Sequence, residues 1–197
     1  MRVRSVLVSA GFALALLLAR AAITGRPDFV FLVWNLFLAL VPVALAHPER
    51  GGIPRWIVWW LFFPNAAYLV TDLVHLRPRA MPYWFDVGLF AAFAWAGLSA
   101  SAWSLARMQA RVVARYRVPF VAAVGLSGGF AIWVGRFLRL NSWDPFVAPW
   151  RTLEHIGRSA VDRPAQALGV TLLFGGLLVV TAMRDGGDAS HRHLRQP

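Results

Sequence analysis

Apolar residues fall into six long runs, and short connections rich in arginine and proline separate them. A helix needs about 20 mainly apolar residues to cross the roughly 30 Å hydrocarbon core of a membrane, so runs of this length predict transmembrane helices. The alternation of apolar and polar residues over about ten positions that marks an outer-membrane barrel is absent. The pattern therefore predicts an all-α polytopic bundle of about six transmembrane helices, near residues 5–23, 29–46, 56–74, 84–106, 119–138 and 166–183.

One connection, residues 139–165, is longer than the others, and several prolines divide it. Its mixture of aromatic and basic residues predicts a short helix that lies in the membrane interface. Residues 184–197 are polar and are predicted to form a disordered tail. Residues 1–183 are therefore expected to form a single transmembrane domain.

The first apolar run superficially resembles a cleavable signal peptide, because arginines precede it and Ala19-Arg20-Ala21 follows it. An arginine inside a cleavage site is unusual and further membrane segments follow, so we expect this run to be retained as the first helix. Small residues recur four positions apart in this and two later segments, which predicts close helix packing there. They are Gly11, Ala15 and Ala19, then Gly88, Ala92 and Ala96, and finally Gly125 and Gly129.

The net charge of +11 by itself would suit a nucleic-acid partner. The arginines instead flank the apolar segments, where they anchor helices, so we expect the lipid bilayer and not a nucleic acid as the partner. With the N-terminus inside, 11 of the 20 arginines lie on the cytoplasmic side and 9, including Arg20 and Arg136, on the other. This count favours an N-in, C-in topology. The absence of cysteine excludes disulfides, thiol nucleophiles and thiolate metal sites.

The third membrane segment carries a polar stripe made of Asn65, Tyr68, Asp72 and, at its end, His75. Their spacing places all four side chains within about an 80° arc of an α-helix. Polar groups in a membrane helix normally face protein or water, because burial in lipid is costly. The stripe therefore marks a candidate functional face.

Successive membrane helices run in opposite directions, so the end of one helix and the start of the next lie on the same side of the membrane. This arrangement brings further polar residues to the same end of the bundle. Asp72 and His75 close the third segment, and unusual polar residues lie at the matching ends of the second, fourth and fifth. These are Asn35, Asp86, Arg136, Arg139, Asn141 and Asp144. The sequence thus predicts one polar cluster at the extracytoplasmic end of helices three to five.

The chemistry of this cluster has several interpretations. Asp72 and His75, one turn apart, suit an acid/base pair, a proton-transfer step or two metal ligands, and equally a hydrogen bond that closes the helix. Arg136 and Arg139 suit a phosphate or carboxylate ligand, and equally ion pairs with nearby aspartates that hold the bundle together. No cofactor or metal is identified by these patterns.

Proline 64 lies near the middle of the third segment and predicts a kink, because it removes one backbone hydrogen bond and frees a carbonyl near Trp60. Asn65 and Tyr68 then either line a polar cavity above the kink or serve packing alone. In the second case Asn65 satisfies the freed backbone or bonds Asn35 across a helix interface.

Four longer motifs resemble the bacterial integral-membrane family catalogued as domain of unknown function 1361. They are Trp34–Pro42, Phe63–Tyr68 with Thr71–His75, Trp84–Asp86 and Gly135–Asp144. The resemblance covers roughly the second to fifth helices and implies a multi-pass protein of the bacterial cytoplasmic (inner) membrane. It implies no activity, substrate or cofactor.

The sequence is compatible with three functions. A structural or assembly role, in which the polar cluster fixes the bundle, is favoured over the other two. One alternative is the binding or transport of a small polar or anionic ligand or a lipid headgroup. The other is a membrane-embedded enzyme that acts on a lipid or envelope precursor with Asp72 and His75.

Overall fold

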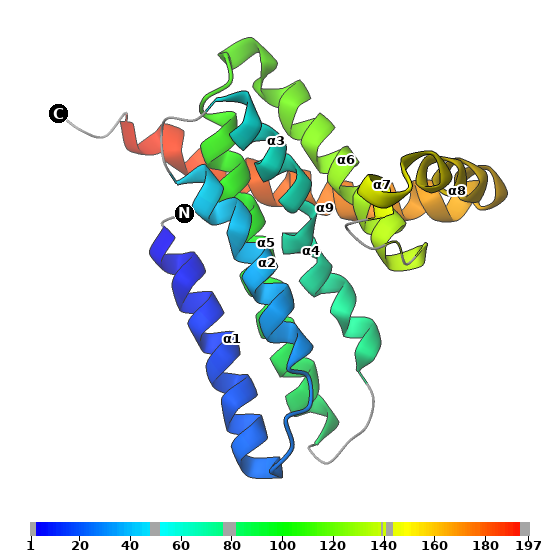
Figure 1. Ribbon diagram of the computed structural model, residues 1–197. Helices are drawn as coiled ribbons and strands as arrows, with labels where there is room; N and C mark the ends of the chain where they lie inside the picture. Colours follow the sequence, from blue (N-terminus) through cyan, green and yellow to red (C-terminus); the bar gives the residue numbers. More distant parts are fainter. Residues whose placement is uncertain (1–2, 48–51, 77–81, 139, 141–143, 194–197) are drawn as a thin grey trace.

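Each apolar run predicted to cross a membrane forms a helix in the computed structural model, which describes residues 3–47, 52–76, 82–138, 140 and 144–193 (Figure 1). For residues 145–146 and 184–193 only the backbone is described. The helices are α1 (Val3–Thr24), α2 (Phe31–Ala46), α3 (Ile53–Phe62), α4 (Pro64–Thr71), α5 (Tyr83–Gln109), α6 (Arg117–Phe137), α7 (Asp144–Val147), α8 (Pro149–Asp162) and α9 (Pro164–His193). The 3₁₀ turn η1 (Asp72–His75) follows α4, and the 3₁₀ turn η2 (Ala114–Tyr116) precedes α6.

Five helical segments within the described residues are long and apolar enough to cross a membrane: 3–24, 53–75, 83–109, 114–137 and 164–183. The sixth, α2, has 16 residues and therefore spans only about 24 Å at 1.5 Å per residue. The predicted all-α membrane bundle is confirmed, and its shortest member falls below the usual spanning length.

Helix α5 is the centre of the bundle. Its apolar stretch is 72% buried, whereas the other four long segments are between 22 and 39% buried. It packs against α1, α2 and α4, and on another side against α9. Figure 1 shows α1, α2 and α5 side by side, with α9 crossing behind them and its first part lying near α7 and α8. The exposed surfaces of the outer helices are rich in Leu, Val and Phe, as expected for contact with lipid.

The predicted kink in the third segment separates α3 from α4 at Phe63. Pro64 occupies the first turn of α4, where its missing N–H costs little. The side-chain amide of Asn65 donates to the carbonyl oxygen of Phe62 at 3.0 Å. Asn65 therefore satisfies backbone freed by the kink, which is one of the two packing roles that the sequence left open.

Close helix contact occurs at only some of the small residues expected to provide it. A Cβ on Gly129 would lie 2.3 Å from the carbonyl oxygen of Thr171 in α9, so this glycine permits the close approach of α6 and α9. In contrast, no described atom lies within 4 Å of a Cβ built on Gly11 or Gly88. Close helix packing is therefore not found at these two glycines, although Ala96, on the same stripe as Gly88, is buried. In α5 the close contact falls instead on Gly97, beside the carbonyl of Ala66.

The long connection contains α7 and α8, so the short helix predicted within residues 139–165 is present as Pro149–Asp162. Helix α9 continues to His193, past residue 183, where the last membrane segment was expected to end. The disordered tail at 184–197 stays a prediction.

Candidate functional site

The polar residues expected to form one cluster are divided between two. The first, here called the Arg20 cluster, consists of Arg20 on α1, Asp28 before α2 and Asp86 on α5. Nε and Nη2 of Arg20 donate to the two carboxylate oxygens of Asp86 at 2.6 and 3.4 Å. Nη1 donates to Asp28 at 3.2 Å. The side chains of Arg20 and Asp86 are both 0% exposed, so this forked ion pair is completely enclosed by protein.

Phe29 completes the surroundings of the Arg20 cluster. The guanidinium carbon lies 4.5 Å from the centre of the Phe29 ring, within the range of a cation–π contact. The same ring meets Phe90 edge to face at 4.9 Å. Phe29 has a backbone φ of 67°, a left-handed conformation that is costly for a bulky residue. The contacts of the ring with Arg20 and Phe90 hold the backbone in this conformation and fix the connection between α1 and α2.

Sequence reasoning selected Asp86 but missed Arg20 and Asp28 as members of a polar site. The charge pattern groups Arg20 with the arginines that flank the membrane segments, although it lies within both the predicted segment 5–23 and α1. The missed signal is the rule that an ionisable residue inside a membrane helix normally has a buried partner. Applied to Arg20, that rule points to an aspartate at the same end of a neighbouring helix.

The second group, here called the Arg136 cluster, consists of Asn35 on α2, Thr71 at the end of α4, Asp72 at the start of η1, and Arg136 in the last turn of α6. Nη2 of Arg136 donates to Oδ1 of Asp72 at 2.6 Å, and Nδ2 of Asn35 donates to Oδ2 at 2.7 Å. Nε of Arg136 donates to Oγ1 of Thr71 at 3.0 Å. The Asp72 side chain is 2% exposed, so both of its oxygens are satisfied within protein.

Tyr68 lies one turn before Thr71 in α4 and supports the Arg136 cluster. Its hydroxyl donates to the carbonyl oxygen of Ala131 at 3.3 Å, and its own carbonyl accepts a hydrogen bond from Thr71 at 2.7 Å. Gly135 leaves room for the phenol, because a Cβ at that position would lie 1.4 Å from the tyrosine oxygen. The glycine before Arg136 therefore allows α6 to approach α4 closely enough for the arginine to reach Asp72.

A cavity of about 690 Å³ adjoins the Arg136 cluster. Its walls come from the end of α4, η1, the end of α6 and the middle of α9. The lining residues are Thr71, Val74, His75, Gly135, Arg136, Phe137, Leu140 and Phe174. The side chains of Arg136 and His75 are 25 and 46% exposed, so both remain accessible beside apolar walls.

His75 is less closely tied to Asp72 than the sequence spacing suggested. Its Nδ1 lies 3.2 Å from the backbone oxygen of Asp72 and 4.0 Å from the carboxylate oxygen Oδ1. The second distance exceeds hydrogen-bond reach, and that carboxylate is already engaged by Arg136 and Asn35. Among the described residues, no three His, Asp or Glu side chains come close enough to hold a metal ion.

Two of the remaining predicted site residues have other partners in the described structure. Asp86 belongs to the Arg20 cluster, and Asn65 bonds the backbone at the kink. Asp144 begins α7. Arg139 and Asn141 lie outside the described residues.

The model of a family described as "Protein of unknown function (DUF1361)" matches residues 34–181, which include every member of the Arg136 cluster. No curated protein and no solved structure matches the chain. Because the match covers most of the chain, this helical protein, with five segments able to span a membrane, belongs to the DUF1361 family.

Proposed function

We propose that this protein is a multi-pass protein of the bacterial cytoplasmic membrane that binds an anionic group in the cavity beside Arg136. The shared chemistry of the ligand is a phosphate or carboxylate, carried by a small solute or by a lipid headgroup. One observation carries the proposal: a partly exposed guanidinium lines a cavity while its other side is held by buried protein groups. A fixed guanidinium is suited to bidentate recognition of such anions.

The hydrogen bonds of the Arg136 cluster support this role. Asp72 and Thr71 engage Nη2 and Nε of Arg136, whereas Nη1 has no hydrogen bond to another described residue. Asp72 is itself held by Asn35, so it orients the guanidinium without occupying the cavity. His75 can add a second donor at the cavity wall. Phe137 and Phe174 supply apolar surface that suits an amphiphilic anion.

The proposed orientation places this cavity on the extracytoplasmic side. The 9 arginines assigned to that side include Arg20 and Arg136, which pair with Asp86 and Asp72. The arginine count remains 11 on the cytoplasmic side against 9 on the other, which supports the N-in, C-in topology.

A structural role is the second candidate, and one observation favours it for the Arg20 cluster alone. Arg20 and Asp86 are completely buried and bond each other at 2.6 Å, without any access for a ligand. The cluster joins α1 to α5 and to the start of α2. We assign the bundle-fixing role to the Arg20 cluster and the binding role to the Arg136 cluster.

The experiment measures ligand binding by the purified full-length protein in detergent. Radiolabelled inorganic phosphate and spin-labelled phosphatidylglycerol are the two probes, which distinguish a small solute from a lipid headgroup. Arg136→Gln keeps an amide donor for Asp72 but removes the charge. A charge-assisted hydrogen bond is worth about 1.5–3 kcal/mol, so affinity for at least one probe should fall by about 10- to 100-fold.

Arg26→Gln is the matched control, because Arg26 is an exposed arginine outside both clusters. This variant should bind like the unmodified protein. His75→Gln should weaken binding while leaving the Asp72–Arg136 ion pair intact, which provides a second test if Arg136→Gln fails to fold. Binding that is absent from the unmodified protein, or unchanged in folded Arg136→Gln and His75→Gln variants, refutes the proposal.

A further inference from the structure

Helix α8 divides its circumference into three faces of different chemistry. One face packs against the rest of the protein through Thr152, the only residue of α8 classed as buried, and through half-buried Ile156, Ser159 and Ala160. At about 100° per residue, these four positions lie within roughly 100° of arc. The protein therefore covers about one third of the helix circumference, which leaves the other two thirds open.

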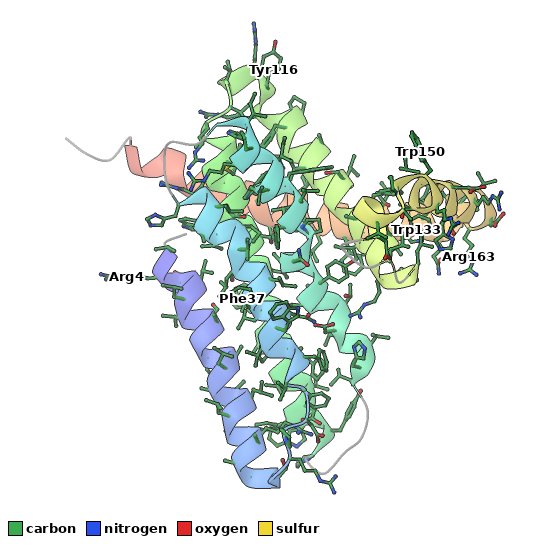
Figure 2. All side chains as sticks on the ribbon, in the orientation of Figure 1. Arg4, Phe37, Tyr116, Trp133, Trp150 and Arg163 are labelled. Carbon is green, nitrogen blue, oxygen red and sulfur yellow. The ribbon has the colours of Figure 1, made fainter. Side chains whose placement is uncertain are left out.

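The second face is apolar and uncovered. Trp150, Leu153 and Val161 are between 58 and 81% exposed. Their spacing places them, together with Gly157, within about 80° of arc. Figure 2 shows Trp150 pointing away from the body of the protein. Three large apolar side chains on one strip of a short helix indicate a surface that meets an apolar phase.

The third face is charged and lies next to the apolar one. It carries Arg151, Glu154, His155 and Arg158, all exposed. Arg158 donates to Glu154 one turn away at 2.5 Å, so part of the charge is balanced within the helix. The face is suited to water and lipid headgroups, and its mixed charge does not require an anionic surface.

The segment that follows α8 indicates what contacts its apolar face. After Arg163 the chain enters α9, whose first 20 residues are apolar enough to cross a membrane. The end of α8 is thus one residue from the start of a membrane-crossing helix. An exposed strip that contains tryptophan at this position lies at the depth where aromatic side chains prefer to sit in bilayers.

We propose that α8 lies along the surface of the same membrane, with Trp150, Leu153 and Val161 inserted among the lipids. Arg151 and Arg158 face the headgroups and water, and the face containing Thr152 holds α8 against the protein. The occupant of the exposed apolar strip is therefore lipid. This inference does not rest on ligand binding at Arg136, because no residue of α8 lines that cavity.

The test uses the natural absence of cysteine from the chain. Single variants Trp150→Cys, Leu153→Cys and Val161→Cys, and separately Arg151→Cys and His155→Cys, are nitroxide-labelled in the full-length protein. After reconstitution into phosphatidylcholine vesicles, spin relaxation by oxygen and by a water-soluble nickel chelate measures the depth of each label. The apolar-face labels should lie about 5–10 Å below the headgroup boundary, and the charged-face labels should be open to nickel.

Two reference labels calibrate the measurement. Val8→Cys lies on an exposed apolar part of α1 and reports lipid, and Arg26→Cys lies on an exposed connection and reports water. Apolar-face labels as accessible to nickel as the Arg26→Cys label overturn the proposal. Labels shielded from both oxygen and nickel overturn it as well, because they show that protein, such as a second copy of the chain, covers the face. Since all labelled positions are exposed, the variants should fold like the unmodified protein.

Discussion

Removal of one partner from the Arg20–Asp86 ion pair should strongly destabilise the protein, and the structure predicts which partner matters more. Asp86 has Arg20 as its only hydrogen-bond partner in the described structure and is 0% exposed. Arg20→Met leaves that carboxylate buried without compensation, which typically costs about 3–5 kcal/mol. Asp86→Leu should cost less, because Arg20 keeps its bond to the partly exposed Asp28. We therefore expect Arg20→Met near the upper end of this range and Asp86→Leu near the lower end.

The double variant Arg20→Met/Asp86→Leu provides the decisive comparison. Replacing both charges by apolar side chains removes the desolvation cost together with the attraction, so such replacements are often neutral or stabilising. The double variant lacks one more charged group than Arg20→Met. Its free energy of unfolding should nevertheless be higher than that of Arg20→Met, because no unpaired carboxylate stays buried at position 86. A pair of independent sites would give the opposite result, since their effects add.

Unfolding by sodium dodecyl sulfate in mixed micelles, followed by fluorescence of the ten tryptophans, measures these free energies. Arg26→Met is the matched control, because Arg26 is exposed, and surface changes of this kind stay within about 0.5 kcal/mol. The reasoning is refuted if Arg20→Met lies within about 1 kcal/mol of the unmodified protein, well below the cost of a broken buried pair. It is equally refuted if the double variant loses the sum of the two single losses.

Three further predictions use the same unfolding measurement. Gly129→Ala should destabilise by about 1–3 kcal/mol, because its Cβ would lie 2.3 Å from a carbonyl oxygen of α9. Gly176→Ala, with no described atom within 4 Å, should change little, and equal losses at both glycines contradict the packing argument. Asn35→Leu leaves one buried oxygen of Asp72 unpaired and should cost about 1–3 kcal/mol; unchanged stability would show that the bond is not needed. Gly135→Ala should displace the nearby tyrosine hydroxyl and lower both stability and phosphate or phosphatidylglycerol binding, so a variant with unaltered binding argues against the cavity.

The apolar pattern alone was sufficient to predict the helices, because the requirement is local. Backbone groups in hydrocarbon must bond within their own segment, so a run of sufficient length becomes a helix whatever its neighbours are. Even the break at Pro64 follows from the missing N–H of one residue. The short helix at 149–162 was likewise expected from the composition of its connection.

The polar residues were predicted less completely, since their roles depend on which helix faces they meet. The sequence identified Asn35, Asp72 and Arg136 at one end of the bundle, and the structure joins them by hydrogen bonds. It grouped Asp86 with them, whereas the tertiary structure pairs Asp86 with Arg20. Helix parity locates the end of a segment but not the direction in which a side chain points.

What the sequence by itself determined is the approximate position of the apolar helical segments and the end at which several polar groups gather. Only the tertiary structure decided that those groups form two sites, one enclosed at Arg20 and one open to a cavity at Arg136. The physical reason is that the burial of a side chain depends on the surfaces of the helices that pack around it. α1 and α5 exclude all solvent around Arg20, whereas the ends of α4 and α6 leave space beside Arg136 that no local pattern records.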